Sequence, residues 1–279
     1  MKEFQAQAVW IMLSFLCIGL LAYLFNAKRI IFSSFACCAL LCVFLKSASN
    51  SALKNPELNN EIKVSVAHVN VTSAEESYKA LTDDLLARDI DIISLQEVKP
   101  DWSRVLKSAL VKTHPYSIEN VRIDPFGMAI FSKFPILEVD TIFVENVPFL
   151  AAKVKLPEGK EVTIVNTMIQ PNINTNLDQV QEKQLNFVRD YLVKNSGTEL
   201  VVGDFNMVYW SNRIREFREG TKLMNSRRDV SQSVLSVPYD HIFHSEDLEC
   251  ISFRDMIDSS GHRIGICAKL QYFNNLQEL

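Results

Sequence analysis

LVVGDFNMVYW, residues 200–210, is the stretch on which the interpretation of the whole sequence depends. The apolar run from Leu200 to Val202 is typical of a buried strand, and the Gly-Asp-x-Asn that follows marks its end. Asp204 and Asn206 can form a simple turn, because such side chains often hydrogen-bond to their own backbone where strands finish. They can also lie at the mouth of a sheet, where α/β enzymes commonly build their sites. The rest of the chain has to decide between these alternatives.

Two apolar segments lie near the start of the chain. Residues 8–25 and 30–45 carry no charged side chain. A transmembrane helix needs about 20 apolar residues, so both segments are slightly short but plausible spans. A second apolar run and the lack of a clear small-x-small site argue against a signal peptide, and the lack of a polar face argues against core helices. We therefore predict a two-helix transmembrane hairpin within residues 1–46.

Positive charges around the hairpin give a weak orientation signal. Lys28 and Arg29 in its turn favour a cytoplasmic turn, whereas Lys2, Lys46 and Lys54 at the other end favour the opposite orientation. We lean to a soluble domain on the extracytoplasmic side.

Residues 47–61 are rich in Ser and Asn and are interpreted as a linker, and residues 62–279 as the soluble domain. From residue 55 onward the chain carries 24 basic and 32 acidic side chains, a net charge of −8. This charge disfavours binding to long duplex nucleic acid without excluding it. Cys250 and Cys267 have no metal-type spacing, and whether they pair stays open, as does the oligomeric state.

Short strands outnumber helices in the soluble domain. Helices are expected over residues 73–89, where Ser73 and Glu76 form a capping box, and over residues 176–195. The segment KLPEGKEV, residues 155–162, is typical of a hairpin. The pattern favours a layered α/β domain with mixed or antiparallel sheets. Strands are expected over residues 62–71, 89–98, 128–132, 151–156, 162–166, 199–203, 240–244 and 264–270.

Polar side chains follow or open most of these strands. Each one is explicable as ordinary strand-end polarity, but their number predicts that they converge on a single cleft. Two other histidines, His114 and His244, are expected at the surface. The strand-end residues are Glu97, Asn166, Asp204, Asn206, Asp240 and His262.

The ordered motifs LQEV, GMAIFSKFPI, VNTM, VVGDFN, YDHIF and GHR resemble those of the endonuclease/exonuclease/phosphatase superfamily, which includes DNase I, abasic-site endonucleases, sphingomyelinases and inositol phosphatases. The resemblance covers residues 62–270 and is greatest to bacterial members with transmembrane helices. It implies two packed mixed β-sheets flanked by helices, a DNase I-like four-layer sandwich. It also implies Mg²⁺-dependent hydrolysis of a phosphoester, with Mn²⁺ as an alternative ion, and a multi-pass protein of the bacterial inner membrane.

The resemblance assigns metal binding to the first two motifs. Glu97 would be a metal ligand, and either His68 or Asn70 would take the place of the asparagine that follows the first strand in the family. A hard cation such as Mg²⁺ prefers carboxylate and amide oxygens and keeps several waters, which fits these residue types.

The resemblance assigns the chemistry to the later motifs. Asp204 and Asn206 would position the attacking water and the phosphate. His262 would lie beside the scissile phosphate, with Asp240 accepting its second ring hydrogen, because an oriented imidazole can hold or move a proton near neutral pH.

A basic stretch follows VVGDFN. Residues 207–229 carry six cations and three acids, mostly expected on a solvated helix face. One or two of the cations could bind a substrate phosphate. Arg213 is the candidate among these cations for substrate binding, in addition to Asn166 and Asn206.

The motifs also depart from the family. Met168 stands where most members have a histidine, and Gly261 stands where most have an aspartate. One lost catalytic donor can cost about 3 kcal/mol of transition-state stabilisation. Two functions therefore remain: a membrane-anchored phosphoesterase acting on a phosphodiester or phosphomonoester, with lipid-linked or small phosphates favoured and a nuclease as an option, or a catalytically weakened relative that serves as a membrane-tethered binding or scaffold module.

Overall fold

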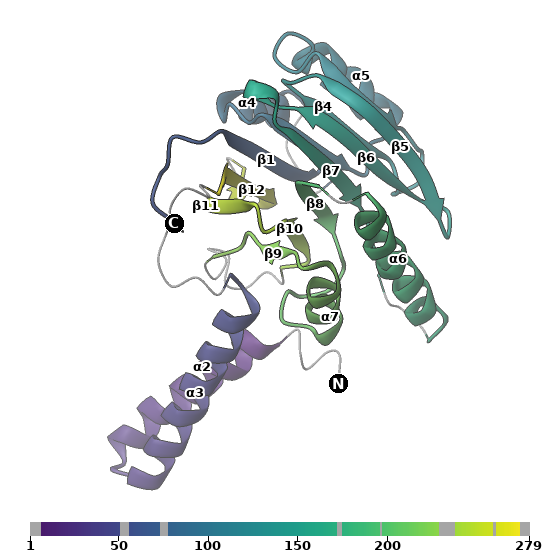
Figure 1. Ribbon diagram of the computed structural model, residues 1–279. Coiled ribbons are helices and arrows are strands. Elements are labelled where there is room, and N and C mark those ends of the chain that lie inside the picture. Colours follow the sequence, from purple (N-terminus) through teal and green to yellow (C-terminus); the bar gives the residue numbers. More distant parts are fainter. Residues whose placement is uncertain are drawn as a thin grey trace.

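Two mixed β-sheets pack face to face in the computed structural model, with helices on their outer faces (Figure 1). This arrangement confirms the predicted α/β class with two mixed sheets. The structure describes residues 7–50, 56–72, 78–171, 175–195, 197–228, 238–258 and 261–273.

The first sheet has the strand order β11-β12-β1-β2-β4-β3. Its strands β1 and β2 run parallel, and the other neighbours run antiparallel. The strands are β1 (Lys63–Asn70), β2 (Ile92–Gln96), β3 (Tyr116–Asn120), β4 (Met128–Ser132), β11 (Leu248–Ile257) and β12 (Arg263–Tyr272).

The second sheet has the strand order β5-β6-β7-β8-β10-β9. Strands β7 and β8 run parallel and the other neighbours antiparallel, and β6 and β7 form the predicted hairpin. The strands are β5 (Ile136–Val144), β6 (Val147–Lys155), β7 (Glu161–Thr167), β8 (Glu199–Asp204), β9 (Met224–Asn225) and β10 (Asp240–His244).

Alternation along the strands sends every second apolar side chain into the space between the sheets. Val66, Ile164 and Val202 belong to this central core. Helices α4 (Tyr78–Ala87) and α5 (Pro100–Leu110) cover the outer face of the first sheet. The apolar faces of α6 (Thr175–Lys194) and α7 (Asn212–Thr221) cover the outer face of the second sheet.

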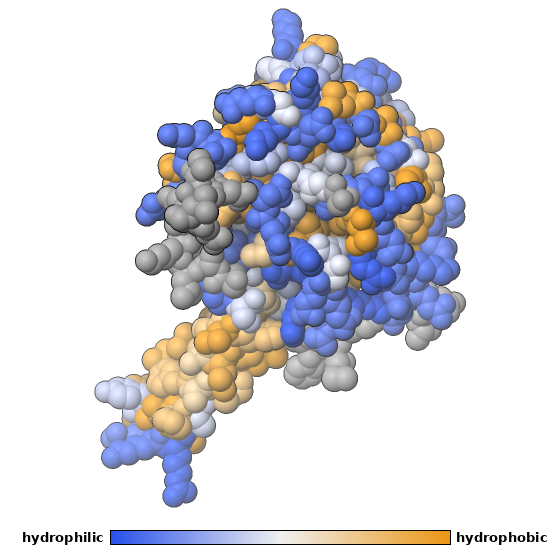
Figure 2. Space-filling model, viewed as in Figure 1, coloured by the Kyte–Doolittle hydropathy of each residue, from blue (hydrophilic) through white to orange (hydrophobic). Residues whose placement is uncertain are grey.

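Two antiparallel helices precede the sheets, α2 (Ala8–Leu24) and α3 (Lys28–Ala48). They pack closely, since a Cβ added at Gly19 would lie 3.0 Å from the Phe35 ring. Their surface is largely hydrophobic (Figure 2). Among the described helices, α3 alone is long and apolar enough to cross a membrane, because α2 has only 17 residues. Of the two predicted membrane spans, only the second, α3, is thus long enough to cross a membrane.

The domain-side end of this helix pair packs on the loop that follows β8. Tyr209 and Trp210 are buried in one apolar cluster with Ala8, Leu45 and Ala48. Three hydrogen bonds to backbone carbonyls reinforce the contact. Lys46 Nζ donates to the Arg228 carbonyl over 2.9 Å, and Asn50 N donates to the Arg227 carbonyl over 2.9 Å. In the other direction, Arg218 Nη1 donates to the Ala48 carbonyl over 2.8 Å.

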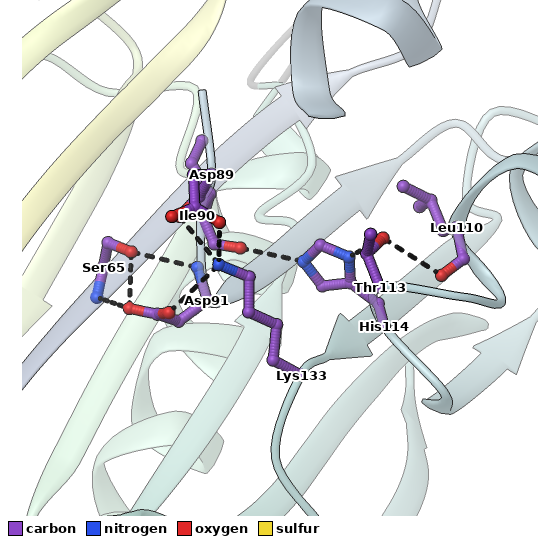
Figure 3. A network of polar contacts seen from close by, with 8 residues as sticks. All are labelled: Ser65, Asp89, Ile90, Asp91, Leu110, Thr113, His114 and Lys133. Carbon is purple, nitrogen blue, oxygen red and sulfur yellow. Dashed lines mark hydrogen bonds and ion pairs between the residues drawn. The ribbon is translucent and has the colours of Figure 1, made fainter. Parts of the chain in front are cut away.

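A polar network fixes the beginning of β2, at the end opposite the polar strand ends (Figure 3). Asp91 accepts from Ser65 Oγ over 2.6 Å and lies 3.3 Å from Lys133 Nζ, and the His114 ring lies 2.8 Å from the Ile90 carbonyl. Burial lowers the pKa of His114. The expected surface position of His114 is wrong, because its ring is needed to satisfy backbone at this end of the sheet.

His244 is also buried rather than exposed. It lies on β10 with 2% of its surface accessible, and burial lowers the pKa of its ring to about 4. The predicted strand over residues 240–244 includes His244, but its side chain lies inside the protein, where Nδ1 is 3.0 Å from the Ser245 carbonyl.

Candidate active site

Four strands bring polar residues to one end of the two sheets. Asn70 ends β1 directly beside Gln96 at the end of β2, and Glu97 follows. In the second sheet, Asp204 at the end of β8 is paired with Asp240 at the start of β10. The topology therefore produces the convergence that the strand-end pattern predicted for these residues.

Asn70 and Glu97 are in direct contact. Asn70 Nδ2 donates to Glu97 Oε1 over 2.6 Å, and Thr72 Oγ1 donates to Glu97 Oε2 over 2.5 Å. Glu97 adopts a left-handed conformation with φ of 61°, which turns its side chain out of the strand toward Asn70. Both oxygens of Glu97 are thus held in place before any ion is considered.

His68 lies deeper than Asn70 on the same strand. It is fully buried, and among the described residues neither ring nitrogen has a hydrogen-bond partner. Burial lowers the pKa of its ring to about 4, although the Asp240 carboxylate opposes the shift. A ring in this interior position does not share the Glu97 contact, so of the two alternatives Asn70 is the residue placed at the edge.

Asp204 and Asn206 form a turn, and that turn lies at the mouth of the sheets. Asn206 N donates to Asp204 Oδ1 over 2.7 Å, and Asn206 Nδ2 donates to the Ile169 carbonyl over 2.9 Å. Asn206 has a φ of 49°, a region that asparagine tolerates better than most residues. Both interpretations of the opening stretch therefore hold, since the turn presents the Asp204 carboxylate to the edge.

The carboxylate of Asp204 is strongly perturbed. Burial, together with the nearby carboxylates of Asp240 and Glu97, raises its pKa to about 7, although the Asn206 N–H and Arg263 oppose the shift. A carboxyl group with this pKa exchanges a proton near neutral pH.

Gln96 connects the two sheets at this edge, a role that the sequence did not reveal. Its Nε2 donates to Asn166 Oδ1 and to the Thr167 carbonyl, each over 2.9 Å, and its Oε1 accepts from Asp204 N over 3.2 Å. Gly203 permits this approach, because a Cβ there would lie 2.7 Å from Gln96 Nε2 and 1.9 Å from the Thr167 carbonyl oxygen on the neighbouring strand β7. In the LQEV motif, the sequence had suggested a role only for Glu97.

Asn166 was predicted to bind substrate, but the structure uses its amide inside the protein. Asn166 is fully buried, and its Nδ2 donates to the Leu95 and Ala129 carbonyls over 3.0 and 3.3 Å. Its Oδ1 accepts from Gln96. The amide connects the two sheets, so its role is structural.

Replacement of Asn166 by alanine is expected to lower the free energy of unfolding by about 3 kcal/mol, because three buried partners lose their hydrogen bonds. Urea denaturation of the full chain measures this, with Asn195→Ala as control, since Asn195 is exposed and bonds only within α6. Unchanged stability with a raised Michaelis constant would restore the substrate-binding role.

Asp240 and His262 were predicted to form a pair, but each has another partner. Arg263 Nη1 donates to Asp240 Oδ2 over 2.7 Å, and Arg263 Nε donates to Asp255 Oδ1 over 2.9 Å. Burial raises the pKa of Asp240, but Arg263 holds it below its ordinary value. The His262 ring is half exposed and lies 3.8 Å from Asp258. A planar guanidinium bridges two buried carboxylates better than an imidazole can, which explains the exchange.

Arg213 was a candidate for substrate phosphate, but it connects two helices. Its Nη1 donates to Gln181 over 2.6 Å and its Nη2 to Asp178 over 3.0 Å, both on α6. Arg227 from the same basic stretch is 1% exposed and lies over the Phe253 ring. Arg213 thus stays on the helices, whereas Arg227 Nη2 lies 3.7 Å from Asp255, the carboxylate that Arg263 also contacts.

The donor set at the edge fits one hard cation. Across the described residues, no group of three or more His, Cys, Asp or Glu side chains is placed to hold a metal ion. Mg²⁺ does not require such a group, because it keeps several waters and binds through one or two carboxylates. Glu97 offers carboxylate oxygens of this kind. The other candidate oxygen, Asn70 Oδ1, accepts from Thr72 N and Thr72 Oγ1 over 3.0 and 2.9 Å, so it would have to exchange these bonds for an ion.

The two departures from the family pattern lie in different surroundings. Met168 is buried in the core between the sheets, so it adds no polar group to the edge. Gly261 has a φ of 88°, and nothing lies within 4 Å of the position of a Cβ there. An aspartate at Gly261 would therefore be strained by its backbone rather than by its neighbours.

A family model described as the Endonuclease/Exonuclease/phosphatase family matches residues 66–262. No protein among curated sequences matches the chain. Solved structures do, and their low identity limits the likeness to the fold. An endonuclease/exonuclease/phosphatase family protein from Bacteroides thetaiotaomicron is 16% identical with a TM-score of 0.64, covering 77% of this chain and 100% of the other.

Two further structures illustrate the range of the fold. The mannosyl-6-phosphatase Bt3783 of B. thetaiotaomicron is 16% identical with a TM-score of 0.62, covering 76% of this chain and 100% of the other. D. rerio TDP2 in complex with a single-strand DNA product is 17% identical with a TM-score of 0.58, covering 75% and 99%. The same architecture thus occurs in a sugar phosphatase and in a DNA-binding protein.

Proposed function

The chain belongs to the endonuclease/exonuclease/phosphatase family, whose chemistry is phosphoester hydrolysis, and from this premise we propose that it is a membrane-attached, Mg²⁺-dependent phosphoesterase. The substrate class we favour is a lipid-linked or small phosphate ester. The net charge of −8 beyond residue 54 supports this choice over long duplex nucleic acid.

One observation carries the proposal. Asp204 has a pKa of about 7 in a site where the carboxylates of Asp240 and Glu97 add to the effect of burial. Structural carboxylates are normally paired, whereas perturbed carboxylates gathered at a strand-end site are typical of catalysis. The meeting of Glu97 after β2, Asp204 at the end of β8 and Asp240 at the start of β10 supports this assignment.

Each residue at the edge then has a proposed role. Glu97 and Asn70 would hold Mg²⁺, which supplies charge neutralisation and polarises the phosphoryl oxygen. Asp204 accepts the proton of the attacking water, and Asn206 holds the turn that aims Asp204. Arg263 keeps Asp240 ionised. The role of His262 beside the scissile phosphate stays a prediction.

Attachment to the membrane is proposed through α3, with α2 packed against it. The end of this pair is buried against Tyr209 and Trp210, which supports a permanent anchor over a cleaved signal, because cleavage would uncover an apolar surface. A multi-pass hairpin in a bacterial inner membrane, with the sheets on the extracytoplasmic side, remains our proposal for its topology.

A second candidate function is a tethered binding or scaffold module with little turnover. Met168 and Gly261 motivate it, because the side chains expected at these positions are missing. The ion pair between Arg263 and Asp240 adds to the case, since it occupies the residue expected to orient His262. Metal binding separates the two functions.

Titration of the full chain in detergent with Mg²⁺ or Mn²⁺ tests the enzyme. Glu97→Gln is expected to weaken metal affinity at least about tenfold, because a neutral amide loses the charge that binds the ion. Glu145→Gln is the matched control, since Glu145 is a surface residue paired with Lys183. Calorimetry and turnover of a generic phosphodiester are the two measurements. Absence of metal binding in the unaltered chain would favour the scaffold.

A further inference from the structure

The basic stretch after the Gly-Asp-x-Asn turn is not used by the proposed chemistry, and the structure gathers part of it where α3 meets the domain. We propose that α7 and the last turn of α3 form a binding site for the phosphate headgroup of an anionic phospholipid. This inference rests on the proposed attachment through α3. It does not depend on catalysis.

A cavity of about 490 Å³ lies between the two helices. The α3 side contributes Phe44 and Ser47, and the α7 side contributes Arg215, Arg218 and Lys222. A phosphate group occupies only part of such a volume, so the glycerol backbone of a lipid fits as well. One wall is therefore apolar and the other is cationic, as the two halves of a lipid require.

Two of the cations are available to a ligand. Arg215 and Lys222 are exposed, and within the described part of the chain neither has an ion-pair partner. Arg218 is already committed, because its Nη1 donates to the Ala48 carbonyl and so caps the end of α3. The acids Glu219 and Glu246 also line the cavity, which leaves it a net charge of +1.

The position of the cavity selects a lipid over other anions. Ala48 is the last residue of α3, and a 21-residue helix is about 32 Å long, close to the thickness of the bilayer core. The end of α3 therefore lies at the depth of the headgroups. Phe44, one turn earlier and 38% exposed, lies where the acyl chains begin.

The surface of the molecule has the same division. Figure 2 shows that the hydrophobic surface of the helix pair ends where the hydrophilic surface over α7 begins. At the far end of the helices, Lys28 and Arg29 lie where the second layer of headgroups would be. Cations beside an apolar span attract anionic lipids by about 1 kcal/mol each.

Retention of lipid by the full chain tests the site. The chain is reconstituted in nanodiscs that contain phosphatidylcholine with phosphatidylglycerol, extracted gently, and examined by native mass spectrometry for bound phosphatidylglycerol. The double variant R215Q/K222Q is expected to retain about tenfold less of it. The matched control K79Q/R104Q, which removes two exposed cations of α4 and α5, is expected to retain as much as the unaltered chain. Glu219→Gln is expected to increase retention.

Each outcome is decisive. Equal loss in both double variants, or no loss in R215Q/K222Q, would overturn the site. Displacement of the lipid by inorganic phosphate at an equal concentration would also overturn it, because the cavity would then be a site for a soluble anion. Flotation with phosphatidylcholine vesicles is measured in parallel. If no variant floats, the proposed attachment fails, whereas a chain that floats and retains lipid without phosphodiester turnover leaves the inference standing and removes the enzyme.

Discussion

Asparagine in place of Asp204 is expected to lower metal-dependent turnover about a thousandfold, because it removes the group that accepts the proton of the attacking water. The turn itself should survive, since the asparagine oxygen can still accept from Asn206 N. In the unaltered protein, the rate should rise with pH and level off as Asp204 ionises, and bound Mg²⁺ should move that point below the pKa of about 7 that Asp204 has without metal. The measurement is turnover of a generic phosphodiester from pH 5 to 9 in saturating Mg²⁺.

The same replacement is expected to make the protein more stable in the absence of metal. The pKa of Asp204 is higher in the folded state than in the unfolded chain, so the folded state binds the additional proton between about pH 4 and 7. Stability is therefore lost as the pH rises through this window. At pH 8, Asp204→Asn should be more stable than the unaltered chain by roughly 2 kcal/mol, and at pH 4 the two should agree.

Added Mg²⁺ should narrow the difference in stability between Asp204→Asn and the unaltered chain at pH 8, because a bound cation favours the ionised carboxylate. Thermal unfolding at both pH values, with and without metal, provides the four comparisons. Equal stability of the two proteins at pH 8 would show that the carboxylate is well solvated or already neutralised. The proposed role of Asp204 as a base near neutral pH would then be lost.

Alanine in place of Gly203 is expected to prevent folding. Its Cβ would lie 1.9 Å from the Thr167 carbonyl oxygen and 2.7 Å from Gln96 Nε2, and the first of these atoms belongs to backbone that cannot move aside. The φ of +153° adds strain for any residue with a side chain. We expect a loss of about 4 kcal/mol or more, comparable with the whole stability of many domains.

Soluble yield and circular dichroism of the full chain measure this loss. Gly197→Ala is the control, because its Cβ would meet nothing closer than 3.9 Å. A Gly203→Ala chain that unfolds within a few degrees of the control would mean that β8 does not approach Thr167 of the neighbouring strand β7 and Gln96 of the other sheet so closely here. The bridging role of Gln96 would then also be wrong.

The sequence predicted the edge of the sheets better than the contacts within it. Glu97, Asp204 and Asp240 could be placed together because apolar runs locate strands and polar residues mark their ends. Asn166 looked the same in the sequence, yet its amide points between the sheets. The difference depends on the face of the strand and on the neighbouring sheet, and neither is encoded locally.

Arg263 shows a second limit. It follows His262 in the motif GHR, and only the histidine was given a role. Its ion pairs with Asp240 and Asp255 join the beginnings of β10 and β12 and a residue of β11, strands that are near in the sequence but belong to different sheets. Such a pairing becomes visible only when the register of both sheets is known.

Helices with few apolar residues were harder to delimit. Helix α7 buries only Ile214 and Phe217, so the sequence indicated a solvated helix face within residues 207–229 without fixing its ends. Helix α5 begins at Pro100, a residue that favours a first turn but was not used as a start signal. The predicted capping box at Ser73 and Glu76 lies outside the described residues.

The burial of Tyr209 and Trp210 under the ends of α2 and α3 also limits whether the domain can exist without these helices. These residues are three and four positions beyond Asn206, so the loop that carries the turn is packed against the helices. Proteolysis between α3 and β1 would expose the apolar side chains of Tyr209 and Trp210 next to the Asp204–Asn206 turn. A form of this protein without the two helices would need polar side chains there, so the helix pair is a part of the fold.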